Sequence, residues 1–243
     1  MAIITQTQKD EFLELGFLRI DNIISDDELD WLRTRYDHMF THDSGATHKQ
    51  LGGTDAEGRD ALPQVLGVTK TFPEFGNLRY RQTIAEIAQF MHGETAMFRN
   101  DHAILKPAGY GIETPWHQDQ AYHDPRYRYK TMNFWLPLHE TTVESGCMWY
   151  VPYTHAGAVV PHAHLVPDDP STAMVAENQA YWQMNGVPVP CPAGSAVLHH
   201  SYIMHYAGPN ITDQPRRAYI CVFEAMCQEL RQPFRFPWQE RFR

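Results

Sequence analysis

The seven residues TPWHQDQ at positions 114–120 carry more information about fold and function than any other stretch of this chain. They place His117 and Asp119 two positions apart in a segment with the character of a β-strand. Because side chains at positions i and i+2 of a strand point to the same face, an imidazole and a carboxylate would converge on one point inside a sheet. A second histidine from elsewhere would complete a 2-His-1-carboxylate triad, which binds Fe(II) and leaves coordination positions open. A solvated loop pair is the alternative, since short motifs also arise by chance.

The third ligand is expected far along the chain, and His205 is the best candidate. It lies in the strand-like run 203–206 and precedes a segment, 208–215, that is rich in turn residues. His200 is a rival, but it lies five positions earlier, so regular alternation points it to the opposite face. The turn residues predict a hairpin-like connection that returns the next strand beside His205. Arg216 lies in this returning segment, where a guanidinium is suited to bidentate binding of a carboxylate such as that of 2-oxoglutarate. A surface salt bridge is its alternative role.

Length and composition indicate one globular domain spanning residues 1–243. The chain is 43% hydrophobic, and it has no Gly/Ser run, Pro-rich spacer or charge block that would mark a linker. Its net charge of −9 argues against a nucleic-acid partner. No apolar run reaches the ~18 residues of a membrane span, and the N-terminus lacks the features of a signal peptide. The four cysteines form no Cys-x-x-Cys pair, so a reduced, cytoplasmic setting is expected.

The order of predicted elements indicates a mainly β fold with flanking helices. Helices are expected over residues 9–15, 26–40 and 77–92, with a strand over 17–20 and a long loop over 42–67. Ser25 and Glu28 form a predicted capping box for the second helix, whose inner face would carry Leu29, Leu32 and Tyr36. Short strand-like runs bounded by Pro and Gly follow at 98–106, 131–138, 148–151, 195–200, 203–206 and 218–225. We therefore expect a helical layer over about residues 1–95, packed against an antiparallel double-sheet barrel over about 96–230.

A resemblance to a known family rests on a series of motifs in a fixed order. These are Gly16–Ile20, Ser25–Leu29, Lys106–Pro107, Trp116–Asp119, Trp135, Glu144–Met148, Val151–His155, Gly194–His205, Gly208–Asn210 and Arg216–Arg217. In this order and spacing the chain resembles the phytanoyl-CoA dioxygenase family of Fe(II)/2-oxoglutarate-dependent oxygenases over nearly its whole length. The resemblance implies a double-stranded β-helix, that is, a jelly-roll or cupin-like barrel.

The same resemblance assigns roles to individual residues. It implies that His117, Asp119 and His205 bind the iron and that Arg216 binds the distal carboxylate of 2-oxoglutarate. It makes Trp135 part of the wall around that co-substrate, with buried core as the alternative. Asn100 and Lys106 lie on a strand that borders the same pocket, and for these two a purely structural role is an equal alternative.

Two departures from the family pattern stand out. The family often has Ser or another small polar residue two positions after the distal histidine, where this chain has Ala207, so one hydrogen bond to the co-substrate is missing or replaced. The turn usually written Pro-Gly-Ser-His is here Pro152-Tyr153-Thr154-His155, which changes a loop rather than the chemistry. Asp119 is present, whereas related halogenases carry a small residue at this position, and this favours hydroxylation over chlorination.

The predicted function is oxidation of a C–H bond in a small-molecule substrate, with release of succinate and CO2. The expected cofactors are Fe(II), 2-oxoglutarate and O2, with ascorbate as a reductant in vitro. A zinc-dependent hydrolase or a non-catalytic cupin-like binding protein are the alternatives, because the same three ligands can hold Zn²⁺. A free substrate is favoured over a CoA ester, since the chain shows no basic patch for CoA phosphates. The segments 42–67, 122–130 and 160–185 are expected to shape the pocket as loops, with His162 and His164 in the last of them and 122–130 as a possible lid.

Overall fold

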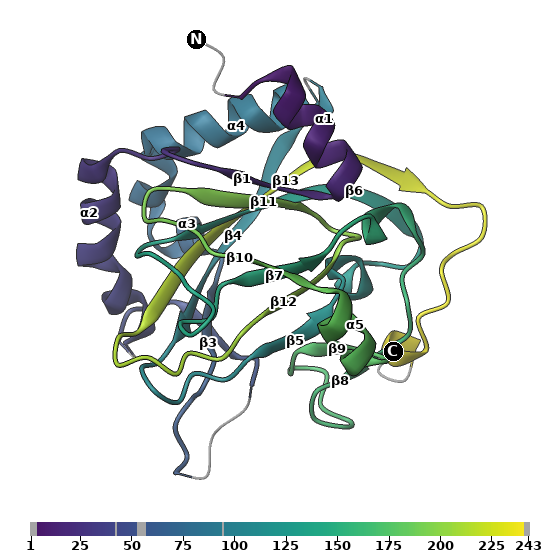
Figure 1. Cartoon of the computed structure of the whole chain (residues 1–243). Helices are drawn as coiled ribbons and strands as arrows, with labels where there is room; N and C mark the ends of the chain where they lie inside the picture. Colours follow the sequence, from purple (N-terminus) through teal and green to yellow (C-terminus); the bar gives the residue numbers. More distant parts are fainter. Residues whose placement is uncertain (1–3, 42, 53–56, 94, 241–243) are drawn as a thin grey trace.

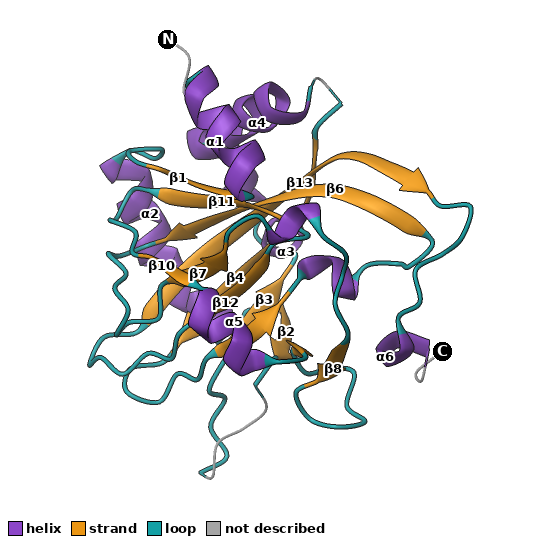
Figure 2. Ribbon diagram, turned by 45° about the vertical axis from the view of Figure 1, so that its right-hand side comes forward, coloured by secondary structure: helices purple, strands orange, loops and turns teal. Residues whose placement is uncertain are grey.

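The computed structural model describes residues 4–41, 43–52, 57–93 and 95–240. Two antiparallel sheets face each other, and helices cover the outer face of the larger one (Figures 1 and 2). The helices and 3-10 turns are α1 (Gln6–Leu15), α2 (Asp26–Tyr36), η1 (Asp37–Phe40), α3 (Val68–Thr71), η2 (Pro73–Asn77), α4 (Arg79–His92), η3 (Asp119–Tyr122), η4 (Thr154–Ala156), α5 (Gln179–Asn185) and α6 (Pro237–Glu240). The strands are β1 (Phe17–Ile20), β2 (Thr47–Gln50), β3 (Pro63–Leu66), β4 (Met97–Lys106), β5 (Thr114–His117), β6 (Tyr127–Pro137), β7 (Met148–Val151), β8 (His162–His164), β9 (Met174–Ala176), β10 (Val187–Val189), β11 (Ala196–His200), β12 (Met204–Ala207) and β13 (Arg216–Glu229).

The strand order is that of a double-stranded β-helix. The larger sheet runs β1-β11-β6-β13-β4-β3-β2, and the smaller one runs β10-β7-β12-β5. A separate pair, β8-β9, lies near the open side of the smaller sheet, where β9 contacts β5. All pairings are antiparallel, so the predicted fold class is confirmed.

Alternation along the two central strands of the larger sheet builds two separate cores. On β6, Phe134 and Leu136 point to the helical layer, whereas Trp135 points between the sheets. On β13, Tyr219 faces the helices and Ile220 faces the barrel interior in the same way. Because successive side chains of a strand point to opposite faces, one strand serves both cores. Every second residue of β6 and β13 is thereby available to line the space between the sheets.

The helical layer begins as the sequence predicts, with one difference in how its helices are capped. Leu29, Leu32 and Tyr36 are buried on the inner face of α2, as expected. Ser25 Oγ accepts a hydrogen bond from the backbone amide of Glu28, which is half of the predicted capping box. The Glu28 carboxylate does not complete it, because Oε1 accepts the backbone amide of Arg79 at the start of α4. The acid therefore connects two helices, and it stabilises the positive end of the second one.

Three segments predicted as loops contain regular structure. The segment 42–67 holds the hairpin of β2 and β3, which extends the larger sheet at its edge; His42 and residues 53–56 of this segment lie outside the described residues. Residues 127–130 are the first part of β6 rather than part of a loop. The segment 160–185 contains β8, β9 and α5, so His162 and His164 lie on a strand. Polar sequences with few apolar residues concealed these elements, which take their order from pairing with neighbours.

The predicted hairpin between His205 and Arg216 is also wrong. Strand β12, which carries His205, pairs with β5 and β7 in the smaller sheet. Strand β13, which begins at Arg216, pairs with β4 and β6 in the larger sheet. The turn residues between them cross from one sheet to the other, and Arg216 approaches the space near His205 from the opposite wall. In the described part of the chain, no helix is both long and apolar enough to cross a membrane.

Candidate active site

Three predicted metal ligands converge between the sheets. In the pairing of β5 with β12, His117 lies directly opposite His205. Strand β5 ends at His117, but Gln118 keeps an extended backbone (φ −118°, ψ 130°), so Asp119 returns to the same side although it starts η3. Asp119 Oδ1 lies 3.6 Å from Nε2 of His117 and 3.6 Å from Nε2 of His205. One ligand atom from each residue falls within 4.8 Å of the others.

The hydrogen bonds of the two histidines set their tautomers. His117 Nδ1 lies 2.7 Å from the carbonyl oxygen of Pro115, and His205 Nδ1 lies 3.0 Å from that of Ile203. A carbonyl only accepts hydrogen bonds, so each Nδ1 carries the hydrogen and each Nε2 lone pair faces Asp119. Burial, together with the neighbouring His117, holds the pKa of His205 well below its usual value, which favours the neutral ring that a metal requires. The donor set, the tautomers and the spacing fit a divalent iron.

The second oxygen of Asp119 is held by residues that the sequence analysis did not identify. Asn133 Nδ2 donates to Oδ2, and His199 Nε2 lies 3.4 Å from the same atom. Tyr150 in turn places its hydroxyl 3.0 Å from Nδ1 of His199. Burial raises the pKa of Asp119, but the neighbouring rings of His205, His117 and His199 outweigh it and hold this pKa well below the usual range. Asp119 is therefore an oriented carboxylate with Oδ1 directed to the two ligand histidines.

A sequence signal for part of this network existed. Asn133 stands two positions before Trp135, so strand alternation puts both on the barrel face of β6. Its contact with His199 depends on the register of β6 with β11, where the two residues are direct partners. The register between two strands so distant in sequence cannot be derived from a single amino-acid sequence. His200, the rival of His205, lies outside the metal-ligand group and makes ring contacts with His92 and His155 instead.

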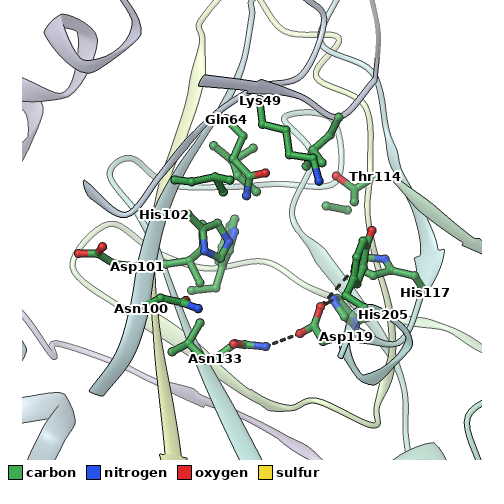
Figure 3. A pocket seen from close by; sticks show the side chains of 18 of the residues that line it. Lys49, Gln64, Asn100, Asp101, His102, Thr114, His117, Asp119, Asn133 and His205 are labelled. Carbon is green, nitrogen blue, oxygen red and sulfur yellow. Dashed lines mark hydrogen bonds and ion pairs between the residues drawn. The ribbon is translucent and has the colours of Figure 1, made fainter. Parts of the chain in front are cut away.

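A cavity of about 430 Å³ adjoins the three ligands. Both sheets contribute to it, and Figure 3 shows polar side chains around it from several strands. Of the residues predicted for the co-substrate, Arg216, Trp135 and Asn100 line the cavity. Further polar residues line the cavity, and four of them lie in the segments 42–67 and 122–130 that were expected to shape it: Lys49, Gln64, Tyr122 and His123. His102 and Thr114 line it as well.

Arg216 is buried in this cavity without a counter-charge. Its exposed fraction is 4%, and neither Nε nor Nη1 has a hydrogen-bond partner among the described residues. The guanidinium carbon lies 5.5 Å from the centroid of the Trp135 ring. Burial lowers the pKa of Arg216 to about 10, because nothing nearby compensates the desolvated charge fully. A buried guanidinium with free donors fits the carboxylate of an absent ligand.

Lys106 lies at the same end of the site but does not line the cavity. Its fully buried ammonium donates to the carbonyl oxygens of Ala207 and Gly208. The carbonyl of Lys106 accepts from the side chain of Asn210. These contacts connect β4 to the end of β12, so the geometry favours the structural role over contact with a co-substrate.

Comparison with known proteins agrees with this geometry. The family model "Phytanoyl-CoA dioxygenase (PhyH)" matches residues 12–218, which is most of the chain. The chain belongs to the phytanoyl-CoA dioxygenase family. The family resemblance seen in the sequence is thus confirmed, and with it the class of Fe(II)/2-oxoglutarate-dependent oxygenases that act on small molecules.

Individual members of the phytanoyl-CoA dioxygenase family are similar over almost the whole chain. The bovine (Bos taurus) phytanoyl-CoA dioxygenase domain-containing protein 1 is 23% identical, and the match covers 90% of this chain and 89% of the relative. Ectoine dioxygenase from Sphingopyxis alaskensis is 24% identical, with 96% and 80% covered. The crystal structure of EvdO2 from Micromonospora carbonacea var. aurantiaca, complexed with 2-oxoglutarate, is 38% identical with a TM-score of 0.85, covering 97% of this chain and 96% of that one.

Proposed function

We propose that His117, Asp119 and His205 bind Fe(II) and that Arg216, stacked near Trp135, binds the distal carboxylate of 2-oxoglutarate. One observation carries this assignment: three correctly oriented ligands and an unpartnered buried guanidinium line a single cavity. When bound, the iron and 2-oxoglutarate activate O2 for oxidation of a substrate C–H bond, with release of succinate and CO2. The protein's own part is to orient these groups and to exclude water from them.

We further propose hydroxylation rather than halogenation as the outcome. Asp119 occupies the carboxylate position, and its second oxygen is held by Asn133 and His199. A carboxylate fixed in this way has no freedom to leave the metal and vacate a position for chloride. Truncating Asp119 to Gly would remove the ligand and is the change that tests this point.

Thr114 is proposed to replace the hydroxyl that the family often has at the position of Ala207. In the pairing of β5 with β12, Thr114 is the direct partner of Ala207, and both line the cavity. Facing residues of paired strands have Cβ atoms only about 5 Å apart, so a hydroxyl on either strand reaches the same region. Thr114 thus supplies a donor on the co-substrate side of the cavity.

The zinc hydrolase alternative finds no support in the arrangement. The three ligands alone would suit zinc as well as iron. A hydrolase has no use for a buried guanidinium in the same cavity as the metal ligands, whereas an oxygenase that takes a dicarboxylate does. The pocket volume suits 2-oxoglutarate together with a small, free substrate, and falls at the low end for ligand sites.

The experiment that tests the site assignment is anaerobic titration of the Fe(II)-loaded protein with 2-oxoglutarate, followed by visible absorption. Chelation of Fe(II) by the keto acid produces a charge-transfer band, which we expect in the wild type and in Arg217→Met. His205→Ala should lose metal binding, and Arg216→Met should require far more 2-oxoglutarate for the same band. A wild-type protein that binds Fe(II) but shows no band at any concentration would refute the assignment.

A further inference from the structure

We propose that the substrate carries an anionic group, a phosphate or carboxylate, which Lys49 and Lys70 bind inside the cavity. This inference rests on the proposed function, because it concerns the part of the cavity that the metal and 2-oxoglutarate leave to the substrate. It follows from the charges that line the cavity, from polar side chains directed into it, and from the nearby acids that are already hydrogen-bonded to other groups.

The charges of the proposed cofactors and their ligands cancel. A doubly positive iron and the guanidinium of Arg216 balance the doubly negative 2-oxoglutarate and the carboxylate of Asp119. The cavity wall has three further charged residues in the described chain: Lys49, Lys70 and Asp101. The loaded site therefore keeps two positive charges unless Asp101 offsets one of them.

The Asp101 carboxylate already has partners other than the two lysines. Its Oδ2 accepts from the Tyr219 hydroxyl at 2.7 Å and lies 3.4 Å from Nη1 of Arg81. Its Oδ1 accepts from the backbone amide and the hydroxyl of Thr69. Figure 3 shows this carboxylate on the far side of β4, directed away from the cavity. Among the described residues, the remaining acid of the cavity wall is Asp119, which belongs to the proposed metal site.

Lys49 is half-buried and Lys70 is exposed, and both contribute to the wall of the cavity. Figure 3 shows the Lys49 side chain extending from β2 with its nitrogen turned inward. The methylenes of Lys70 lie against Gly67, where an added Cβ would come within 3.0 Å of the Lys70 Cδ. Gly67 has a φ of 61°, so the backbone turn that carries Lys70 over the cavity also favours glycine. The chain has only five lysines, and two of them line this one cavity.

Neutral polar groups accompany the two charges. The Gln64 side chain is buried, with an exposed fraction of 7%, and its amide points into the cavity. The His102 ring is directed inward beside it. An amide and an imidazole directed into the cavity can hydrogen-bond to a ligand that carries several oxygen atoms.

The electrostatics of Lys49 are consistent with a missing anion. Burial lowers the pKa of Lys49, and the nearby Asp169 compensates only in part. Asp169 forms no ion pair with Lys49, since its carboxylate accepts from the amide and hydroxyl of Ser171. An anion bound in the cavity would supply the counter-charge.

The test uses three probes of similar size on the anaerobic protein saturated with Fe(II) and 2-oxoglutarate: phenyl phosphate, benzoate and the neutral benzyl alcohol. Calorimetry should show at least one anion binding about tenfold or more tightly than benzyl alcohol. Lys49→Gln and Lys70→Gln should each lower the affinity for the preferred anion by about three- to tenfold, the range expected for loss of one charge-assisted contact. Lys9→Gln removes the same charge outside the cavity, where its ammonium contacts the Phe90 carbonyl, and should leave binding unchanged.

The outcomes separate this inference from the proposed function. The charge-transfer band of bound 2-oxoglutarate is recorded in the same samples and should persist in the Lys49→Gln/Lys70→Gln double variant. No preference for either anion, or a preference that survives in the double variant, would overturn the inference while leaving the oxygenase assignment intact. Loss of the band in the double variant would also overturn it, because the lysines would then serve the co-substrate. Absence of the band in the wild type would instead refute the proposed function.

Discussion

Replacing Arg216 by methionine should make the ligand-free protein more stable while removing its co-substrate affinity. The burial of Arg216 lowers its pKa from 12.5 to about 10, so the charged form is disfavoured in the folded protein. For a base with a depressed pKa, this destabilisation is fully present at every pH below the folded value and is relieved only between about 10 and 12.5. At neutral pH the cost is therefore complete, and it amounts to about 3 kcal/mol at 1.36 kcal/mol per pKa unit.

Methionine retains much of the side-chain volume and needs no counter-charge. We expect Arg216→Met to raise the free energy of unfolding of the ligand-free protein by about 1–3 kcal/mol, after some loss of packing against Trp135. In a chain of this length each kcal/mol moves the melting temperature by about 2–4 °C. The affinity for 2-oxoglutarate should fall at least about 100-fold, because a buried carboxylate would lose its charged partner.

Urea and thermal unfolding with and without 2-oxoglutarate measure both effects. At 100 times the wild-type dissociation constant, 2-oxoglutarate should stabilise the metal-loaded wild type by about 2.7 kcal/mol and Arg216→Met by no more than about 0.4 kcal/mol. Arg217→Met is the matched control, since Arg217 pairs with Asp37 on the outside at 2.6 Å and should not alter co-substrate affinity. If Arg216→Met bound 2-oxoglutarate within threefold of the wild type, or unfolded more readily without ligand, the reasoning about this uncompensated charge would be refuted.

Three further predictions address the surroundings of the site. Asn133→Leu should lower Fe(II) affinity by about 10- to 100-fold in anaerobic titration, because it frees the outer oxygen of the ligand carboxylate, with circular dichroism checking that the fold is retained. Thr114→Val should weaken 2-oxoglutarate binding several-fold, and adding Ala207→Ser should restore it; no rescue would argue against the shared hydroxyl position. Gly186→Ala should cost about 1–3 kcal/mol of stability in urea, since the new Cβ would approach Cη2 of the buried Trp116 to 2.3 Å, and an unchanged midpoint would show that the indole can move aside.

Local patterns predicted that His117, Asp119 and His205 come together, because two of these residues are close in sequence and all three follow strand alternation. His117 and Asp119 are two positions apart, and the extended backbone of Gln118 is enough to bring them together although the strand itself ends at His117. Phe17–Ile20 and Met148–Val151 were predicted with their observed bounds, because short alternating runs between turn residues leave little choice.

Features that depend on which strands pair were not accessible. The turn-rich segment before Arg216 indicated a reversal, but turn residues do not reveal whether the chain returns to the same sheet or crosses to the opposite one. The β2–β3 hairpin lacks a strong apolar alternation and is ordered by pairing with β4. Lys106 lies an even number of positions from His102, so strand alternation predicts that both face the cavity. The long side chain of Lys106 instead donates a hydrogen bond to the carbonyl oxygen of Ala207 in β12. In each case tertiary contacts decided what local pattern left open.

Succinate formation by anaerobically purified protein is the measurement that tests the central claim most directly. The protein receives Fe(II), 2-oxoglutarate, ascorbate and O2, with His205→Ala and Arg216→Met alongside and Arg217→Met as control. The account predicts slow uncoupled turnover in the wild type and in Arg217→Met, and none above background in the other two variants. Turnover that persists in His205→Ala or Arg216→Met, or a wild type that binds Fe(II) and 2-oxoglutarate but forms no succinate, would contradict it.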